Sequence, residues 1–349
     1  MPLTGPRPLP PRWMRRVVLA PAMIGLTVTL LLTLPVWLLV AAAASPLLPG
    51  KFRPLRVLWV VLVWLVLESA CLLALFGLWL AAGFGALTRT PPFQRLHYRL
   101  VGGYLWVFHR AATRVLGLRV EIEGPDPDEY LGRPLLVFSR HAGPGDSFLL
   151  MHALVNWYAR EPRIVLAAAL QWDPAIDVVL NRLPNRFLST GGPAVERQIA
   201  ALATALDGDD AFVIFPEGGN FTERRRAAGI ARLRARGLED AARRSEAMRH
   251  VLPPQPGGVA AALSAAPEAD VVWVAHAGLD HLFTVADLWR ELPLDGVVRM
   301  HWWRVPADEV PAELDAQVEW LYSWWERIDA WVDAARVSEG RPGPTPPGT

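Results

Sequence analysis

A histidine and an aspartate stand five residues apart where an apolar segment gives way to glycine and proline. His141 and Asp146 flank Ala-Gly-Pro-Gly, directly after the apolar segment Leu135–Ser139. On one straight helix the two side chains would point about 140° apart, but this composition favours a turn. The turn lets Asp146 accept a hydrogen bond from one nitrogen of His141, which leaves the other nitrogen free to take a proton. The spacing predicts a general base; the alternative is that Asp146 or Ser147 only caps a helix and His141 is a turn residue.

A glutamate follows a second apolar segment in the same manner. Ala211–Phe215 ends in Pro216, Glu217, Gly218 and Gly219. Proline cannot continue a central strand and glycine permits tight turns, so we expect Glu217 at the end of a strand, facing a cleft. There it could orient an acceptor hydroxyl or brace an arginine; the alternative is an ordinary strand-to-helix turn. Three arginines come next, and they either bind phosphate or anionic lipid or form a solvated helix face: Arg224, Arg225 and Arg226.

Strand-like and helix-like segments alternate through the rest of the chain. The pattern predicts an α/β domain with a largely parallel sheet and helical cover. Chemistry in such sheets usually lies at the carboxyl ends of strands, where both motifs fall. The expected strands are Val120–Ile122, Leu135–Ser139, Arg163–Ala168, Arg186–Ser189, Ala211–Phe215, Val271–His276 and Val297–Arg304. The expected helices are Phe93–Leu116, Ser147–Trp157, Val195–Leu206, Arg224–Arg236, Leu238–Met248 and Ala312–Arg336.

Two long apolar segments precede this domain. Val17–Gly50 has no charged residue and Val57–Leu87 has only Glu68, and a helix needs roughly 20 apolar residues to cross a bilayer. We expect a transmembrane helical hairpin kinked at Pro35, rather than two buried core helices or a re-entrant hairpin that never crosses. Glu68 either meets a lipid head group or partner helix, or is protonated and bonded to a hydroxyl such as that of Thr27. Basic residues before the first helix favour a cytoplasmic N-terminus, and two crossings would place the catalytic domain on the same side. We expect an integral protein of the plasma membrane.

The 349 residues divide accordingly into four predicted parts. These are a disordered tail at 1–16, the hairpin at 17–88, a catalytic domain at 89–337 and a second disordered tail at 338–349. The net charge of +1 gives no indication of nucleic-acid binding. Cys71 is the only cysteine, which excludes intramolecular disulfides and cysteine-based metal sites. We expect no metal; His276 with Asp280 and His281 imitates a ligand cluster, but no cysteine or glutamate stands at ligand spacing.

Taken together, the His141-x4-Asp146 and Phe215-Pro-Glu-Gly motifs behind a hairpin resemble the glycerolipid acyltransferase family, typified by 1-acyl-sn-glycerol-3-phosphate acyltransferases. The chain looks most like the lysophosphatidate and lysocardiolipin acyltransferase branch. The similarity continues through Phe221-Thr-Glu-Arg, Arg236-Gly-Leu and Val251-Leu-Pro to a closing pattern that includes Arg304-Val-Pro, Trp320-Leu and Asp329.

The resemblance implies direct acyl transfer without metal, cofactor or acyl-enzyme. His141 would deprotonate a lysophospholipid hydroxyl, which then attacks the thioester of acyl-CoA or acyl-carrier protein as co-substrate. Asp146 would orient His141, and the acceptor would meet Pro216, Glu217, Gly218, Arg186, Arg224 and Arg225. The absence of a G-x-S-x-G motif agrees with a route that has no covalent intermediate.

Three departures from the family pattern remove positive charge where a phosphate would bind. Gly219-Asn220 stands where the family often has Thr-Arg, Arg186 lies at the wrong end of the segment 185–190, and no basic residue follows Pro253. The acceptor could therefore be another lysophospholipid or a glycolipid. Two other functions remain as alternatives: a non-catalytic lipid-binding membrane protein that retains the fold, and a CoA-independent phospholipid transacylase.

Overall fold

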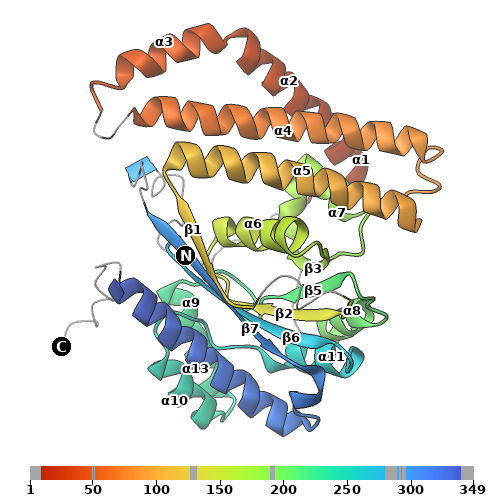
Figure 1. Ribbon diagram of the computed structural model, residues 1–349, viewed down its shortest axis with the longest axis vertical. Helices are drawn as coiled ribbons and strands as arrows, with labels where there is room; N and C mark the ends of the chain where they lie inside the picture. The colour runs from red at the N-terminus through yellow and green to blue at the C-terminus, as the bar shows by residue number, and fades with distance from the viewer. Residues whose placement is uncertain are drawn as a thin grey trace. The chain divides into compact units, whose positions relative to one another are not determined.

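The structure, a computed structural model, describes residues 9–48, 50, 52–125, 132–188, 193–279, 289–290, 292 and 296–338. Its strands form a seven-stranded sheet in the order β1-β7-β6-β2-β5-β3-β4 (Figure 1). The pairs β1 with β7, β6 with β2, β2 with β5 and β3 with β4 are parallel, and β6 with β7 is antiparallel. The predicted α/β class with a largely parallel sheet is therefore confirmed. The chain divides into two compact units, which are described separately.

Unit 1 comprises residues 1–118, 163–191 and 288–295. Its helices are α1 (Arg12–Met14), a π-helical turn (Arg15–Leu19), α2 (Ala20–Leu32), α3 (Leu34–Ala44), α4 (Arg53–Ala81), α5 (Pro91–Leu116), a 3-10 turn (Ala168–Trp172) and α7 (Pro174–Leu180). It also holds β4 (Arg186–Leu188) and most of β3 (Glu161–Ala167). Its buried core includes Leu72 and Leu75 of α4, Tyr98 of α5 and Val179 of α7.

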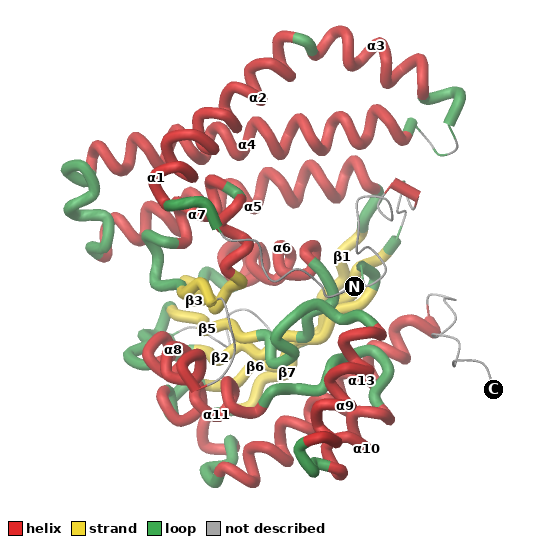
Figure 2. Tube along the Cα trace, turned by 180° about the vertical axis from the view of Figure 1, so that it is seen from behind, coloured by secondary structure: helices red, strands yellow, loops and turns green. Residues whose placement is uncertain are grey.

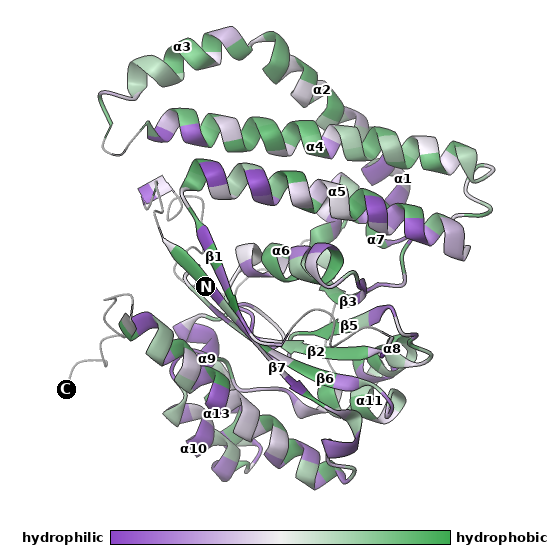
Figure 3. Cartoon of the chain, in the orientation of Figure 1, coloured by the Kyte–Doolittle hydropathy of each residue, from purple (hydrophilic) through white to green (hydrophobic). Residues whose placement is uncertain are grey.

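The first long apolar segment breaks at Thr33. Thr33 leaves helical geometry at φ −95° and ψ 3°, and Pro35 lies in the first turn of α3. The predicted kink is thus confirmed as a break between two helices. The helical stretches Arg12–Leu32 and Arg53–Ala81 are each long and apolar enough to cross a membrane, and α2, α3 and α4 are predominantly hydrophobic in Figure 3.

Two local expectations for the first 118 residues differ from the structure. Residues 12–16 lie in the predicted tail but are helical, because the buried Arg15 pairs with Asp177 of α7 at 2.8 Å. Glu68 accepts a hydrogen bond from a hydroxyl, but that of Tyr104 on α5 at 2.8 Å rather than that of Thr27. Residues 1–8 and 339–349 of the two predicted tails lie outside the described residues.

Unit 2 comprises residues 119–162, 192–287 and 296–349. Its strands are β1 (Arg119–Glu123), β2 (Leu135–Ser139), β5 (Asp210–Ile214), β6 (Asp270–Ala277) and β7 (Val297–Val305). Its helices are α6 (Pro144–His152) with a π-helical turn (Ala153–Trp157), α8 (Pro193–Ala203), α9 (Glu223–Ala235), α10 (Glu239–Ala247), α11 (Pro256–Ala265), a 3-10 turn (Ala307–Glu309) and α13 (Leu314–Ser338).

The core of unit 2 lies around three parallel strands. Every residue of β2, β5 and β6 is buried, as expected for central strands covered on both faces. Phe138, Phe212 and Trp273 are among its largest buried side chains. Helices α8 and α11 lie side by side (Figure 2), and α13 packs against β6. These three strands are the ones that carry the candidate site.

Candidate active site

The sheet register brings three titratable residues to the same level on adjacent strands. Phe138 of β2 pairs with Ile214 of β5, and Ser139 pairs with Val274 of β6. His141, Glu217 and His276 each lie three residues beyond a set of paired residues, namely Phe138 of β2, Ile214 of β5 and Trp273 of β6. The three residues therefore lie at the same level, near the carboxyl ends of their strands. The sequence motifs placed the first two at strand ends; the pairing of β5, β2 and β6 makes all three neighbours.

His141 is held as a neutral base. Its ring stacks on Phe215 with centroids 4.4 Å apart, and its carbonyl oxygen accepts a hydrogen bond of 2.8 Å from the N–H of Phe221. Burial, followed by the positive charges of His276, Arg225 and Arg140, lowers the pKa of His141 to about 4. At neutral pH the imidazole is therefore uncharged and can accept a proton.

Asp146 contacts two groups at the start of α6, the backbone of Gly143 and the ring of His276. Its Oδ2 accepts a 2.6 Å hydrogen bond from the N–H of Gly143, which caps the helix, and its Oδ1 lies 3.3 Å from Nδ1 of His276. Among the described residues, Nδ1 of His141 has no hydrogen-bond partner. The predicted bond between His141 and Asp146 is therefore not made through this nitrogen here. Catalytic hydrogen bonds often tighten only when substrate is bound, so this pairing stays a prediction.

The geometry around His276 fixes one of its protons. Nε2 lies 2.8 Å from the carbonyl oxygen of Arg140, and since a carbonyl only accepts, Nε2 must donate. Its Nδ1 lies 3.3 Å from Oδ1 of Asp146, and both side chains are 1% exposed. His276 and Asp146 thus lie next to each other in the buried part of the site.

Glu217 is buried beside His141. Its Oε1 accepts a hydrogen bond of 3.3 Å from the backbone N–H of His141, whereas Oε2 is buried without a hydrogen-bond partner among the described residues. Burial raises the pKa of Glu217 to about 8, although Arg140 and two backbone N–H groups act in the opposite direction. At neutral pH the carboxyl group is therefore mostly protonated, and Oε2 can donate a hydrogen bond to a substrate oxygen.

Gly218 is required by the turn that presents Glu217. Its φ is +67°, a conformation that costs little only for glycine, and a Cβ atom there would lie 2.4 Å from Nε2 of Gln255. The N–H of Gly218 donates to Phe215, and the carbonyl of Pro216 accepts a 2.8 Å bond from the N–H of Gln255. The segment 215–218 is thus fixed by its own turn and by Gln255.

A buried arginine, Arg140, links the ends of β2 and β6 to the loop at residues 249–250. Arg140 has a fully buried side chain that donates to the carbonyl oxygens of His250 at 2.9 Å and His276 at 2.8 Å. Asp329 of α13 accepts hydrogen bonds from the N–H groups of Arg249 and His250, at 2.9 Å and 2.6 Å to Oδ1. The loop at 249–250 therefore links Arg140, at the end of β2, to Asp329 of α13.

The three arginines of α9 have different surroundings. Arg225 is exposed, donates to the carbonyl oxygen of Asn220 at 3.0 Å, and its Nη1 would lie 3.1 Å from a Cβ atom on Gly219. Its guanidinium therefore lies beside the two positions where the family often has Thr-Arg. Arg226 donates to the carbonyl oxygens of Met248 and Glu246 and is structural, whereas Arg224 is exposed.

Arg186 begins β4 in unit 1 and is exposed, so it does not belong to the unit that holds the other candidates.

Sequence reasoning missed His276 and Arg140 as members of the site. His276 was considered only as part of a metal-like cluster, whose other members, Asp280 and His281, lie outside the described residues. Its place at the end of a strand was a usable signal, but only the parallel pairing of β6 with β2 puts it beside Asp146. Arg140 directly precedes His141, and nothing in the sequence indicates that its side chain is buried.

Residues 119–276 match the family model described as Acyltransferase. The chain carries an acyltransferase domain. The predicted resemblance to the 1-acylglycerol-3-phosphate acyltransferase type is confirmed over this range, which runs from the start of β1 to His276. No curated protein and no solved structure matches the chain. The activity class of the acyltransferase domain is the transfer of an acyl group from a donor to an acceptor.

Proposed function

We propose that this protein is an integral-membrane acyltransferase that moves a fatty acyl group from acyl-CoA or acyl-carrier protein to the free hydroxyl of a lysophospholipid. The observation that carries the proposal is the neutral, half-buried His141 beside the protonated Glu217 at the carboxyl ends of two adjacent strands of an acyltransferase domain. A base and a hydrogen-bond donor next to each other fit the attack of a hydroxyl on a carbonyl carbon.

The proposed reaction is a single displacement on the thioester. His141 takes the proton of the acceptor hydroxyl as that oxygen forms a bond to the thioester carbonyl carbon. The carbon–sulfur bond then breaks, and the departing thiolate takes the proton from the imidazolium and leaves as the thiol. Asp146 holds the ring and stabilises its positive charge, while Glu217 binds an oxygen of the acceptor. No covalent enzyme intermediate and no metal is needed for these steps.

An anionic acceptor is favoured by Arg225. The sequence has Asn220 where the family often has a phosphate-facing arginine, but the guanidinium of Arg225 lies against the backbone of that position. It also faces the site closely enough to lower the pKa of His141. Arg225 can therefore supply the charge that the motif lacks, and we propose a phosphate-bearing lysophospholipid as the acceptor.

The test uses the full-length protein in washed membranes with radiolabelled acyl-CoA and a panel of lysolipids. We expect diacyl product from the wild type, and a loss of on the order of 10²–10⁴-fold in His141→Ala, because the general base is removed. His301→Ala, which removes a histidine on β7, is the matched control and should retain activity. Equal activity in His141→Ala would contradict the role of His141. Diacyl product without acyl-CoA would instead identify a transacylase, and no product with any lysolipid would identify a lipid-binding protein.

A further inference from the structure

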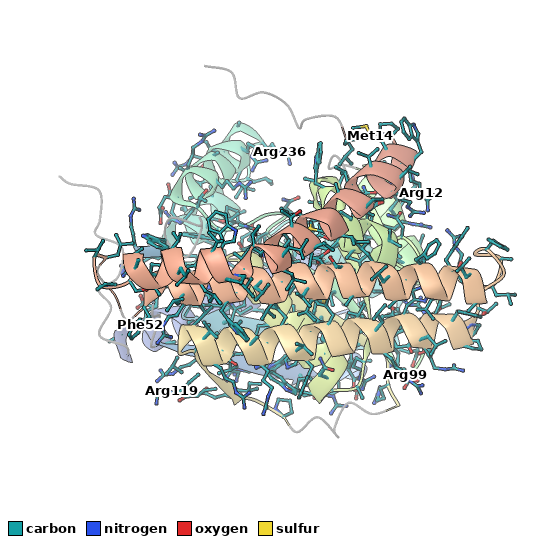
Figure 4. The ribbon with its side chains drawn as sticks, turned by 90° about the horizontal axis from the view of Figure 1, so that it is seen from above. Arg12, Met14, Phe52, Arg99, Arg119 and Arg236 are labelled. Carbon is teal, nitrogen blue, oxygen red and sulfur yellow. The ribbon has the colours of Figure 1, made fainter. Side chains whose placement is uncertain are left out.

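A groove runs along the surface of unit 1 between α4 and α5. These helices lie side by side and antiparallel: Figure 4 shows Phe52, just before α4, and Arg99, in the first half of α5, at opposite ends of the pair. The groove has a volume of about 440 Å³, within the roughly 300–1,000 Å³ typical of ligand sites. Its walls include Trp59 and Val63 of α4 and Trp106, Val107, Arg110 and Arg114 of α5.

The walls of this groove are apolar and open to the surroundings. Trp59 is 50% exposed and Trp106 is 51% exposed, although both are among the largest apolar side chains of the chain. Exposed apolar side chains gathered in one groove indicate a binding surface rather than scattered surface residues. One end is fixed by Arg56, whose guanidinium donates to the carbonyl oxygen of Val115 and so joins the start of α4 to the end of α5.

Two arginines line this groove, Arg110 and Arg114. Arg110 lies over the ring of Trp106 at 5.5 Å, and within the part of the chain that the structure describes neither Arg110 nor Arg114 forms an ion pair. Helix α5 contains no aspartate or glutamate, and α4 contains only Glu68, which is bound to Tyr104. The positive charge of the groove is therefore available to an external anion.

We propose that this groove binds an anionic phospholipid of the surrounding bilayer. The phosphate would meet Arg110 and Arg114, and an acyl chain would lie along Trp59, Val63 and Trp106. Apolar walls with two guanidinium groups match a ligand that has a chain and an anionic head, and tryptophan and arginine both favour the level of the lipid head groups. A peptide would place backbone polar groups against apolar walls, and a soluble anion would leave those walls uncovered.

This binding does not depend on acyl transfer, because the groove contains none of the candidate catalytic residues. The bound phospholipid is therefore a resident lipid and not the proposed acceptor. A binding measurement on the intact protein tests the groove whatever the outcome of the activity assays.

The experiment is native mass spectrometry of the full-length protein in detergent, titrated with phosphatidylglycerol or with phosphatidylcholine of the same chains. We expect a defined phosphatidylglycerol adduct, with phosphatidylcholine binding on the order of tenfold more weakly. The double variant Arg110→Gln/Arg114→Gln should lose this preference. The matched control is Arg95→Gln/Arg99→Gln, which removes the same charge from exposed positions of α5 outside the groove and should keep it.

A second variant separates the groove from general surface charge. Val63→Trp fills the groove but leaves both arginines in place, so we expect it to weaken the phosphatidylglycerol adduct on the order of tenfold. Equal binding of the two lipids would overturn the proposal, as would equal losses in the two double-arginine variants or full binding by Val63→Trp. Monodisperse elution and an unchanged thermal midpoint for each variant confirm that folding is intact.

Discussion

Around His141, burial and neighbouring charges set the protonation states that the proposed acyl transfer needs. The pKa of His141 is lowered to about 4, so the neutral base persists at all higher pH values. The pKa of Glu217 is raised to about 8, so its proton is present at all lower pH values. The window between these two values is where both residues have the forms that the proposed reaction uses.

The pH dependence of kcat/KM tests this assignment. We expect a plateau near neutral pH, a fall below about pH 4 as His141 takes a proton, and a fall above about pH 8 as Glu217 loses one. Glu217→Gln should retain activity and lose the alkaline limb, because an amide N–H donates at every pH. An unchanged alkaline limb in this variant would show that another group titrates there.

Arg225 provides the second residue-scale prediction, which concerns the acceptor. Arg225→Gln should raise KM for an acidic lysophospholipid roughly tenfold, because one charge-assisted hydrogen bond to phosphate is lost. The KM for an uncharged monoacylglycerol should not change. Arg232→Gln, an exposed arginine further along α9, is the control for a general loss of positive charge. If both variants raise KM equally, Arg225 makes no specific contact with the phosphate.

At the scale of secondary-structure elements, α13 stabilises the loop at 249–250 next to the site through Asp329. The sequence named Asp329 only as part of a closing pattern, and the structure gives its physical role. Its carboxylate accepts from the N–H groups of Arg249 and His250, and the carbonyl of His250 then receives the guanidinium of Arg140. A helical residue 80 positions further along the chain thereby holds the loop that contacts Arg140 after β2.

Replacing Asp329 should therefore reduce both stability and activity. Asp329→Ala leaves two backbone N–H groups without their acceptor, at about 1–3 kcal/mol for an unsatisfied buried group. We expect a lower thermal midpoint in detergent together with lower acyl transfer. Asp315→Ala removes an exposed carboxylate from the first turn of the same helix and should lower stability by less than about 1 kcal/mol. Equal midpoints for the two variants would contradict the supporting role of Asp329.

At the scale of the whole molecule, two long apolar helices precede the acyltransferase domain, and we propose that they hold the protein in a membrane. The segments Arg12–Leu32 and Arg53–Ala81 have the length and composition of membrane spans. Two crossings return the chain to its starting side, so the sequence predicts that the acyltransferase domain and the N-terminus face the cytoplasm.

Cysteine labelling tests this topology, since Cys71 is the only native cysteine. In a Cys71→Ser background, Arg236→Cys after α9 should react with an impermeant maleimide only in inverted vesicles. Leu48→Cys, between α3 and α4, should react only in right-side-out vesicles. If both sites react from the cytoplasmic side, the hairpin is re-entrant and does not cross. If Arg236→Cys reacts from outside, the predicted orientation is wrong.

The sequence by itself determined the strands, most of the helices and which residues stand at strand ends. Local patterns suffice for this, because apolar periodicity follows the geometry of each element and because glycine and proline mark where a strand must stop. All seven strands were predicted within about two residues of their bounds. Helices α7 and α11 were missed, and α6 begins earlier than expected because Pro144 is compatible with a first helical turn.

Only the tertiary structure decided which of these strand ends are neighbours. Parallel strands pair through long connections, so the order β6-β2-β5 depends on how the whole sheet assembles and not on any local spacing. That order brings His276 to Asp146, and the turn after Glu217 places Arg225 beside the position of Asn220. Burial, which sets the pKa values of His141 and Glu217, likewise arises only when the elements pack together.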